Sequence, residues 1–385
     1  MSNILELLRG IEVEWKPLVD IILPTSNIKW RDAERTYRYI DLTSVSIETK
    51  SITETSEITP SNAPSRAQKI VQKDDVIFAT TRPAQQRYCL IDDEYSEEVA
   101  STGYCVLRAK KELVLPKWIL YCIASTEFKT YVEDNQSGSA YPAISDAKVK
   151  DFKIPIPPLE IQAEIVRILD NFTELTAELT AELTARKKQY NYYRDHLLSF
   201  EDGEVEWKPL GDIALIGTGS HDTQDAIEDG DYIFYARGRD PLRLNVFDFD
   251  ETAIITAGDG AGVGKVFHYA QGKYALHQRA YRIVPKDVME PRFVYHYISS
   301  YFYTYIQKAS VSSSVTSLRR PMFLNFQIPV PPLAEQARIV AILDKFDALT
   351  NSLTEGLPRE IALRQQQYEY YRELLLRFPK TEVEA

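Results

Sequence analysis

Cysteine is scarce in this sequence of 385 residues, which has only Cys89, Cys105 and Cys122. An odd number without Cys-X-X-Cys spacing argues against a disulfide framework and against a zinc site. We therefore expect reduced thiols in the core of a cytoplasmic protein. No apolar run approaches the roughly 20 residues that span a membrane. The first fifteen residues also lack the apolar stretch and the small-residue cleavage site of a signal peptide.

Histidine is scarce too, and every histidine follows residue 195. The first half of the chain therefore has no histidine to act as a general base or a metal ligand. The run GDGAGVGK at 258–265 resembles a phosphate-binding loop. However, Asp259 stands where that motif requires glycine, and Val266 replaces its Ser or Thr. We expect a tight hairpin there, and we find no catalytic or metal-binding constellation in the sequence.

Positive charge is in deficit, with 45 Lys and Arg against 56 Asp and Glu and a net charge of −11. Part of the acidic excess is local, since residues 160–186 hold six acidic and two basic residues, a net charge of −4. Net charge describes solubility rather than the sign of one face. The deficit therefore weakens a nucleic-acid-binding hypothesis without excluding it.

The most informative feature is a long internal repeat. Residues 154–175, IPIPPLEIQAEIVRILDNFTEL, return as residues 328–349, IPVPPLAEQARIVAILDKFDAL, with 14 of 22 positions identical. Residues 186–200, RKKQYNYYRDHLLSF, return as 364–378, RQQQYEYYRELLLRF, with 9 of 15 identical. Each copy begins with a proline pair, which fixes an extended approach and suits a first helical turn.

Both copies of the repeat have the periodicity of a long amphipathic helix, with apolar residues three and four positions apart. A narrow apolar stripe on so long a helix requires a partner, and we expect each copy to pack on the other. The residues expected to make this packing are Ile165, Ile168, Phe172, Leu175, Leu179, Tyr190, Tyr193, Ile339, Ile342, Phe346, Leu349, Tyr368 and Tyr371.

The segments between the repeats have mixed α and β patterns. The motif VEWKPLVDI opens the first segment at 13–21, and it returns as VEWKPLGDI at 205–213 with 8 of 9 positions identical. The patterns predict strands at 39–46, 75–80, 103–107, 232–236, 253–257, 265–269 and 281–284, and helices at 4–8, 117–132 and 292–307.

The order of elements indicates one architecture used twice. We expect an α+β fold, with two mixed α/β domains separated by two long helices that form an antiparallel coiled coil with pseudo-twofold symmetry. The repeated motifs also place the N-terminal segment near the end of the second helix. The expected boundaries are 1–157 for the first domain, 158–200 for the first long helix, 201–327 for the second domain, and 328–385 for the proline lead-in and second long helix.

The expected length of the helices would let the two domains reach separated stretches on one face of a DNA duplex. A helix over 158–200 would be roughly 60 Å long at about 1.5 Å per residue, against about 34–36 Å for one turn of DNA. The second copy has four extra residues between Leu349 and Arg364, which nearly keeps the apolar face in phase because a turn has about 3.6 residues. Gly356 and Pro358 lie there, so we expect a kink or break.

The doubled signature resembles the conserved helical regions of DNA specificity subunits of type I restriction-modification systems. It consists of the proline pair with the following leucine, then IVxxLDxF, then QYxYYRxxLL. The resemblance covers essentially the whole chain. Segments that look like parts of the target-recognition domains of this family are 63–68, 80–83, 137–145, 257–265, 277–281 and 312–321.

This resemblance implies a non-catalytic, sequence-specific double-stranded DNA-binding subunit whose two domains each read one half of a bipartite target. The helices would set the spacing and dock two modification subunits, which carry S-adenosylmethionine and methylate adenine N6. Restriction subunits, where present, would add cleavage that depends on ATP and Mg. The chain itself would hold no cofactor and no metal.

The loops offer residues suited to DNA contacts, because arginine can bond guanine bidentately and hydroxyl groups can position phosphates. Any single arginine is as readily explained by a solvated loop or an internal salt bridge. Arg66, Arg82, Arg319 and Arg320 are favoured because they lie in loops rich in Ser, Thr, Pro or Gly. The residues expected to contact DNA are Lys29, Trp30, Arg31, Arg66, Arg82, Arg87, Ser137, Ser139, Tyr141, Arg237, Arg239, Lys265, His277, Arg279, Ser314, Arg319 and Arg320.

Two other functions remain open from the residues alone. A coiled-coil scaffold whose two domains bind proteins would have the same helices, but it should not retain duplex DNA in a salt-dependent, sequence-selective way. A stand-alone nuclease is disfavoured because the chain lacks a cluster of acidic residues suited to one. For Tyr190 and Tyr193 we prefer helix packing to base stacking, since both follow the apolar period.

Overall fold

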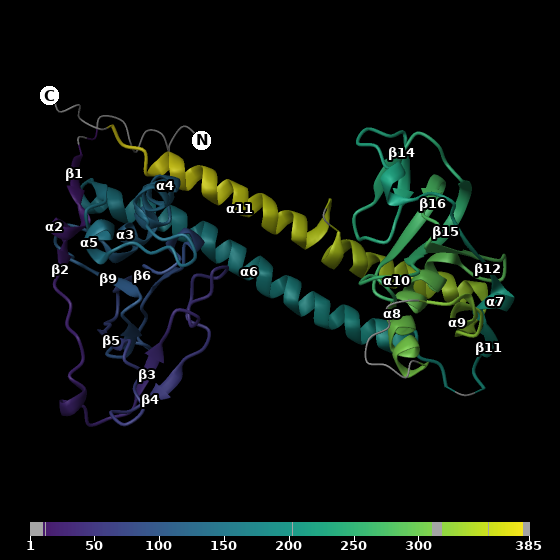
Figure 1. Cartoon of the computed structure of the whole chain (residues 1–385), viewed down its shortest axis with the longest axis horizontal. Coiled ribbons are helices and arrows are strands. Elements are labelled where there is room, and N and C mark those ends of the chain that lie inside the picture. Colours follow the sequence, from purple (N-terminus) through teal and green to yellow (C-terminus); the bar gives the residue numbers. More distant parts are fainter. Residues whose placement is uncertain (1–10, 12, 202, 310–317, 353, 380–385) are drawn as a thin grey trace. The chain divides into compact units, whose positions relative to one another are not determined.

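The computed structural model describes residues 11, 13–201, 203–309, 318–352 and 354–379. The chain folds as two compact units, one formed by Met1–Glu178 with Ile361–Ala385 and the other by Leu179–Glu360. In Figure 1 the yellow C-terminal helix lies with the purple and blue elements, so the first unit contains residues from both ends of the sequence. The helix expected at 4–8 is outside the described residues.

The first unit contains a two-stranded ladder and two small sheets. Strand β1 (Glu14–Pro17) pairs antiparallel with β10 (Lys153–Ile156), with Trp15 opposite Pro155. One sheet has the strand order β2-β9-β6-β7 and the other β4-β3-β8-β5. The bounds are β2 Ile22–Leu23, β3 Tyr37–Ile40, β4 Ser56–Ile58, β5 Ala67–Ile70, β6 Val76–Ala79, β7 Tyr88–Leu90, β8 Val99–Ser101 and β9 Tyr104–Ala109.

The helix expected at 117–132 is two helices, α3 (Pro116–Ile123) and α4 (Thr126–Asn135). Ser125 causes the break, because its hydroxyl donates to the Cys122 carbonyl at 2.7 Å and accepts from the Phe128 N–H at 3.2 Å, which caps α4. The shorter helices of this unit are α2 Leu18–Ile21 and α5 Asp146–Lys150.

The strands of the first unit surround an apolar core. The strand expected at 39–46 ends at Ile40, since the Ser44 N–H donates to the Asp41 carbonyl at 3.1 Å and turns the chain.

All three cysteines are buried free thiols, as expected of core residues. Burial raises the pKa of Cys89 to about 12, so this thiol is not a reactive one.

The second unit repeats the ladder and has a larger sheet. Strand β11 (Glu206–Pro209) pairs antiparallel with β18 (Gln327–Val330), and Trp207 lies opposite Pro329 in the register of the first ladder. The six-stranded sheet has the order β12-β17-β15-β16-β13-β14. The bounds are β12 Ala214–Thr218, β13 Tyr232–Tyr235, β14 Leu242–Leu244, β15 Phe249–Ala257, β16 Phe267–Leu276 and β17 Ala280–Pro285.

The glycine-rich run between β15 and β16 is the expected hairpin, because these two strands pair antiparallel along their length. Both strands are longer than their sequence patterns predicted. The helices of this unit that pack near the sheet are α7 Leu210–Ile213, α8 Pro291–Ala309 and α9 Arg320–Leu324.

The motifs VEWKPLVDI and VEWKPLGDI differ at one position, and packing explains the difference. Val19 of the first copy is 49% exposed. Its counterpart is Gly211, where an added Cβ would lie 2.7 Å from a side-chain atom of Leu324 in α9. Glycine at 211 therefore lets α9 pack closely on α7.

The repeats form three long helices: α6 (Leu159–Leu197), α10 (Leu333–Asn351) and α11 (Gly356–Leu375). The break expected in the second copy is confirmed between α10 and α11. Gly356 has a φ of 75°, and a Cβ there would be 2.3 Å from the Ala348 carbonyl oxygen. Only glycine tolerates both the left-handed backbone and this close approach.

Within each unit, part of α6 packs on a helix of the second copy. In the first unit Phe172 stacks on Tyr371, with ring centroids 5.4 Å apart. In the second unit Tyr193 stacks on Phe346 at 5.5 Å, and Tyr190 also contacts that ring. The two stacked pairs occupy equivalent positions of the repeat, so one packing contact occurs twice.

Candidate nucleic-acid interface

In the first unit, backbone hydrogen bonds draw together the loops that carry Arg66 and Arg82. The Arg66 carbonyl accepts from the N–H of Thr102, and the next residue along, Gly103, accepts from the N–H of Thr80, both at 2.8 Å. The Arg82 N–H donates to the Pro142 carbonyl at 2.7 Å. These hydrogen bonds therefore bring together the loops of Arg66, Arg82 and Pro142 through the turn at residues 102–103.

The loop at 137–143 forms one side of this place. Ser137 and Ala143 exchange two backbone hydrogen bonds of 2.9 Å, which close the loop on itself. Ser137, Ser139 and Tyr141 are all exposed, and the Arg82 guanidinium lies 5.0 Å from the centre of the Tyr141 ring. An exposed arginine beside an exposed aromatic ring suits contacts to phosphate and base.

Arg82 has an unusual backbone for an arginine. Its φ of 50° and ψ of 52° lie in the left-handed region, directly before the short 3-10 helix η2 (Pro83–Gln85). This conformation is costly for a residue with a side chain, and such residues cluster at functional sites. Among the described residues, neither Arg66 nor Arg82 forms an ion pair with a carboxylate.

Two expected contacts of the first unit are occupied by the protein itself. The Trp30 indole N–H donates to the Ala67 carbonyl at 2.8 Å, and the ring packs edge-on against Tyr37. The Arg87 guanidinium donates to the Val45 carbonyl. The structure therefore gives Trp30 and Arg87 roles within the fold.

The neighbours of Trp30 remain on the surface. Lys29 is exposed, and Arg31 lies 3.3 Å from the carboxylate of the adjacent Asp32. The Ile28 N–H donates to the Gln68 carbonyl at 2.8 Å, so this segment is beside the Arg66 loop.

In the second unit, one carboxylate holds two of the expected arginines. Asp259 accepts from Arg237 at 2.9 Å and from Arg279 at 3.0 Å. Burial of Asp259 opposes its ionisation, but the hydrogen bonds and charges of Arg237 and Arg279 outweigh that effect and lower its pKa. The sequence reasoning named both arginines and missed the acid between them.

The start of α9 lies beside the hairpin loop that carries Asp259. The Leu318 N–H donates to the Gly258 carbonyl at 2.7 Å, which places Arg319 and Arg320, both exposed, beside the hairpin loop. Lys265 is exposed, with its ammonium group 4.9 Å from the centre of the Tyr303 ring. Arg239 is exposed as well, whereas Ser314 is outside the described residues.

His277 is the candidate that the structure most clearly reassigns. It is 1% exposed, and its Nδ1 accepts from the Arg279 N–H at 2.9 Å. Burial is the largest cause of a lowered pKa for this ring, so it is neutral near pH 7. A buried neutral ring cannot reach DNA, and His277 instead fixes the backbone of Arg279.

In the first unit a single carboxylate links α3 to the long helix α6. Asp170 of α6 accepts from the Lys117 ammonium at 2.7 Å and from the Tyr121 hydroxyl at 2.6 Å. Both donors lie on α3, one helical turn apart. This aspartate therefore fixes the domain to its long helix. We call this contact, in which one aspartate of the long helix accepts from two donors of a domain helix, the joint of the unit.

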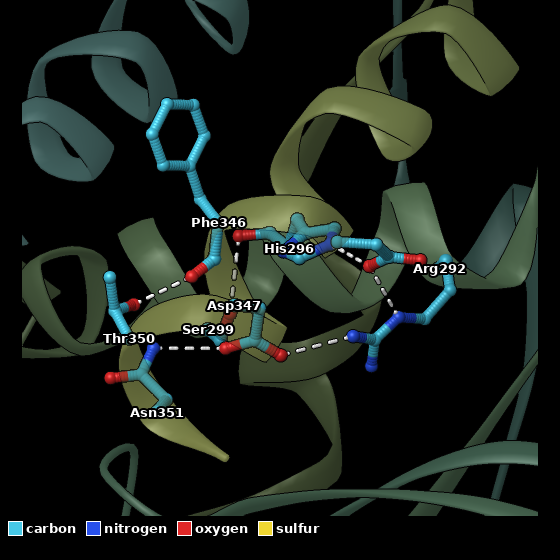
Figure 2. Close-up of polar contacts among 8 residues, drawn as sticks. Arg292, His296, Ser299, Phe346, Asp347, Thr350 and Asn351 are labelled. Atoms are coloured by element: carbon cyan, nitrogen blue, oxygen red, sulfur yellow. Dashed lines mark hydrogen bonds and ion pairs between the residues drawn. The ribbon is translucent and has the colours of Figure 1, made fainter. Parts of the chain in front are cut away.

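The second unit has the same joint with different donors (Figure 2). Asp344 of α10 accepts from Arg292 at 2.9 Å and from His296 Nε2 at 2.7 Å, and Arg292 also pairs with Asp347 at 3.1 Å. Asp344 is the repeat counterpart of Asp170. The sequence analysis included this aspartate in the IVxxLDxF signature but assigned it no role.

The residues expected to pack between the helices differ in burial. Ile165 and Ile339 are buried, while Tyr193 is 37% exposed despite its stacked ring. Leu169 and Leu343, which were not among the expected residues, are fully buried. The remaining candidates are half-buried: Ile168, Phe172, Leu175, Leu179, Tyr190, Ile342, Phe346, Leu349, Tyr368 and Tyr371.

The His296 joint predicts a pH-dependent stability of the second unit. Burial of the ring lowers its pKa below the usual value of about 6.5 and outweighs the opposing effect of Asp344. Unfolded chains therefore bind more protons than folded ones just below pH 6.5. The stabilisation is complete above that pH and falls as the pH decreases, by about 1.4 kcal/mol per unit of pKa difference.

The matched variant is His296→Tyr, which copies Tyr121 of the first unit. We expect hydrogen exchange of the second unit in the variant to depend less on pH between about 6.5 and 5. An unchanged pH dependence would show that His296 is not the titrating group. The first unit, which has no histidine in its domain, serves as an internal reference.

Comparison with known proteins matches this doubled architecture. The family model described as "Type I restriction modification DNA specificity domain" matches the chain twice, at residues 24–186 and 203–363. The chain belongs to this family. It is a DNA specificity subunit, as the doubled helical signature indicated.

Curated relatives of this specificity subunit agree over nearly its whole length. It is 38% identical to the EcoR124I/EcoR124II specificity subunit of Escherichia coli, over 99% of this chain and 98% of the relative. It is 29% identical to the EcoprrI specificity subunit of Escherichia coli, over 92% of each.

Solved structures support the fold. A structure of the type I restriction-modification system has a chain with a TM-score of 0.61 at 23% identity, covering 96% of this chain and 98% of that chain. The S subunit from M. genitalium gives 0.63 at 16% identity, covering 97% and 98%. The mixed α/β architecture with two matching domains is thereby established. Among the described residues, no helix is both long and apolar enough to span a membrane.

Proposed function

We propose that each unit of this specificity subunit reads one half of a bipartite DNA target. The observation that carries the proposal is the contrast between the two units. They share the ladder, the joint aspartate and the ring stack, whereas their exposed cationic loops differ in sequence and in partners. A common scaffold with two different cationic surfaces suits two different half-sites on one duplex.

In this proposal the recognition domains are residues 1–157 and 201–327, and the helices of 158–200 and 328–385 pair as an antiparallel coiled coil. The stacking of Phe172 on Tyr371 and of Tyr193 on Phe346 supports the pairing, because the contacts are equivalent by the repeat. The helices then set the distance between half-sites and dock two modification subunits.

The chemistry belongs to the partners. Modification subunits would bring S-adenosylmethionine and methylate adenine N6, and restriction subunits, where present, would bring ATP and Mg for cleavage. The complex would work in the cytoplasm, where the target DNA is. This chain would contribute the recognition of sequence and no catalytic group.

The test is reconstitution with the modification subunits. The chain alone is expected to transfer no methyl group, whereas the complex should methylate adenines at a split target, found by mapping methylated adenines across the source genome. Methyl transfer by the purified chain would overturn the non-catalytic role. Absence of salt-dependent, sequence-selective DNA retention by the complex would favour a protein-binding scaffold instead.

Arg82→Ala and Arg319→Ala should each weaken binding through one half-site only. A bidentate contact to a base is worth about 1–3 kcal/mol of discrimination. The measurement is binding of the complex to targets with substitutions in either half. Equal loss on every sequence would reduce that arginine to a phosphate contact. Arg87→Ala, whose guanidinium is held by Val45, is the matched control for loss of positive charge.

A further inference from the structure

The glycine-rich hairpin of the second unit brings one acid between two arginines that come from different segments. Asp259 is in the hairpin, Arg237 follows β13, and Arg279 precedes β17. The side chains of the arginines are 41% and 62% exposed, and that of Asp259 is 24% exposed. The cluster is therefore open to a ligand on its arginine side.

The glycines of this hairpin explain why the acid can reach both arginines. A Cβ at Gly258 would lie 2.6 Å from the Arg279 carbonyl oxygen, and one at Gly262 would lie 2.7 Å from that of Arg237. Side chains at these two positions would push the hairpin away. The glycine-rich run, which the sequence presented as a failed phosphate loop, is thus fitted to the two arginine-bearing segments.

The charges of this cluster matter for DNA binding. Two free guanidinium groups attract phosphates of any sequence, and that attraction supplies nearly all non-specific affinity. An acid bonded to both reduces the net charge of the cluster to +1. It also holds each planar guanidinium in a fixed orientation, which is what bidentate recognition of a base edge requires.

We propose that Asp259 is a specificity-determining residue, which withholds Arg237 and Arg279 from non-specific phosphates and orients them for the base edges of the second half-site. The inference rests on the proposed function of this unit and adds a residue that contacts the arginines rather than the DNA. Non-specific DNA lacks base edges that match the guanidinium orientations held by Asp259, whereas the target supplies them.

The experiment compares the complex of this chain and its modification subunits with the same complex carrying Asp259→Asn. Affinity is measured across a range of salt concentrations for two duplexes. One contains the target sequence found by mapping methylated adenines, and the other has a shuffled sequence. We expect non-specific affinity to rise about threefold to tenfold at low salt. The slope of log affinity against log salt should steepen by about one, since one more phosphate is neutralised. Target affinity should change less, so the specificity ratio falls.

Two controls separate this role from others. Asp229→Asn removes the same charge from an exposed residue of the same unit that forms no ion pair among the described residues, and it should change non-specific affinity less than twofold. Asp259→Glu keeps the acid and should stay close to wild type. Equal effects of Asp259→Asn and Asp229→Asn, or a uniform loss of affinity for both duplexes in Asp259→Asn, would overturn the proposal.

Failure of the proposed function has a different signature. If the wild-type complex does not prefer its target duplex over the shuffled one, the proposed function itself is wrong, whatever the variants show. A wild-type complex that does prefer it, with Asp259→Asn behaving like Asp229→Asn, rejects only the role of Asp259. Thermal unfolding of Asp259→Asn checks that the hairpin substitution leaves the unit folded. If it does not, Asp259→Ser, which also removes the charge, provides the same comparison.

Discussion

Replacing Gln336 by alanine is expected to lower the free energy of unfolding of the second unit by about 3 kcal/mol. Gln336 is fully buried at the start of α10. Its side-chain oxygen accepts from the Glu290 N–H at 2.7 Å, and its amide donates to the carbonyls of Pro331 at 2.8 Å and Val288 at 3.2 Å. Alanine leaves these three backbone groups unpaired and opens a cavity.

The repeat provides a matched variant for this prediction. Gln162, the counterpart in α6, accepts from the Leu115 N–H at 2.9 Å and donates to the carbonyls of Pro157 and Leu113 at 2.8 and 3.0 Å. Gln162→Ala should therefore destabilise the first unit by a similar amount and spare the second. Hydrogen exchange resolved by unit measures both effects, because the two units need not unfold together.

A variant of similar volume separates the hydrogen bonds from the packing. Gln336→Leu fills the space yet leaves the three backbone groups unpaired, so it should be nearly as damaging as alanine. Glu335→Ala, at a partly exposed residue whose carboxylate pairs with its helix neighbour Arg338, should change stability little. A Gln336→Leu protein as stable as wild type would mean that the amide contributes packing and not hydrogen bonds.

The sequence predicted the repeated parts of this protein well because those parts depend on local signals. Proline pairs, the apolar period and the Gly356 break each act over a few residues, and the two copies of the repeat contain the helices α6, α10 and α11. The β-ladders were not predicted as pairs. The partner of Trp15 is Pro155, far along the chain, and no local pattern specifies such a pairing.

The candidate interface was predicted less well, and the reason is physical. Loop arginines follow no periodic pattern in the sequence. The sequence therefore could not separate Arg66, which forms no ion pair with any residue that the structure describes, from Arg87, which is held by a carbonyl. His277 reads as a polar loop residue in the sequence, whereas the sheet buries it. In the sequence, Asp259 served only to exclude a phosphate-binding loop. Its role as the partner of two arginines depends on the fold, which brings Arg237 and Arg279 beside it.

The joints show which differences between the units are tolerated. Asp170 and Asp344 are identical, but their donors are Lys117 and Tyr121 in one unit and Arg292 and His296 in the other. Each pair provides a cation and a second donor one turn apart on the domain's helix. The requirement is therefore for hydrogen-bond geometry at the long helix, which leaves the loops of each domain free to differ.

Replacing Phe323 by alanine is expected to have the largest effect of all, a loss of about 3–5 kcal/mol in the stability of the second unit. Phe323 is fully buried. Its ring stacks on Phe302 with centroids 4.8 Å apart and contacts Tyr281 at 4.6 Å. It is the anchor of α9, a helix of five residues that would not be stable without tertiary packing.

The consequence for recognition follows from what α9 carries. Arg319 and Arg320 are at its start, so loosening the helix should reduce discrimination at the second half-site while the first half-site is still read. Phe323→Leu keeps most of the volume and should cost less than about 1.5 kcal/mol. Phe128→Ala, at a fully buried ring of the first unit, should reverse the pattern. If Phe323→Ala impaired both half-sites equally at a temperature where the first unit stays folded, the two domains would not be independent readers.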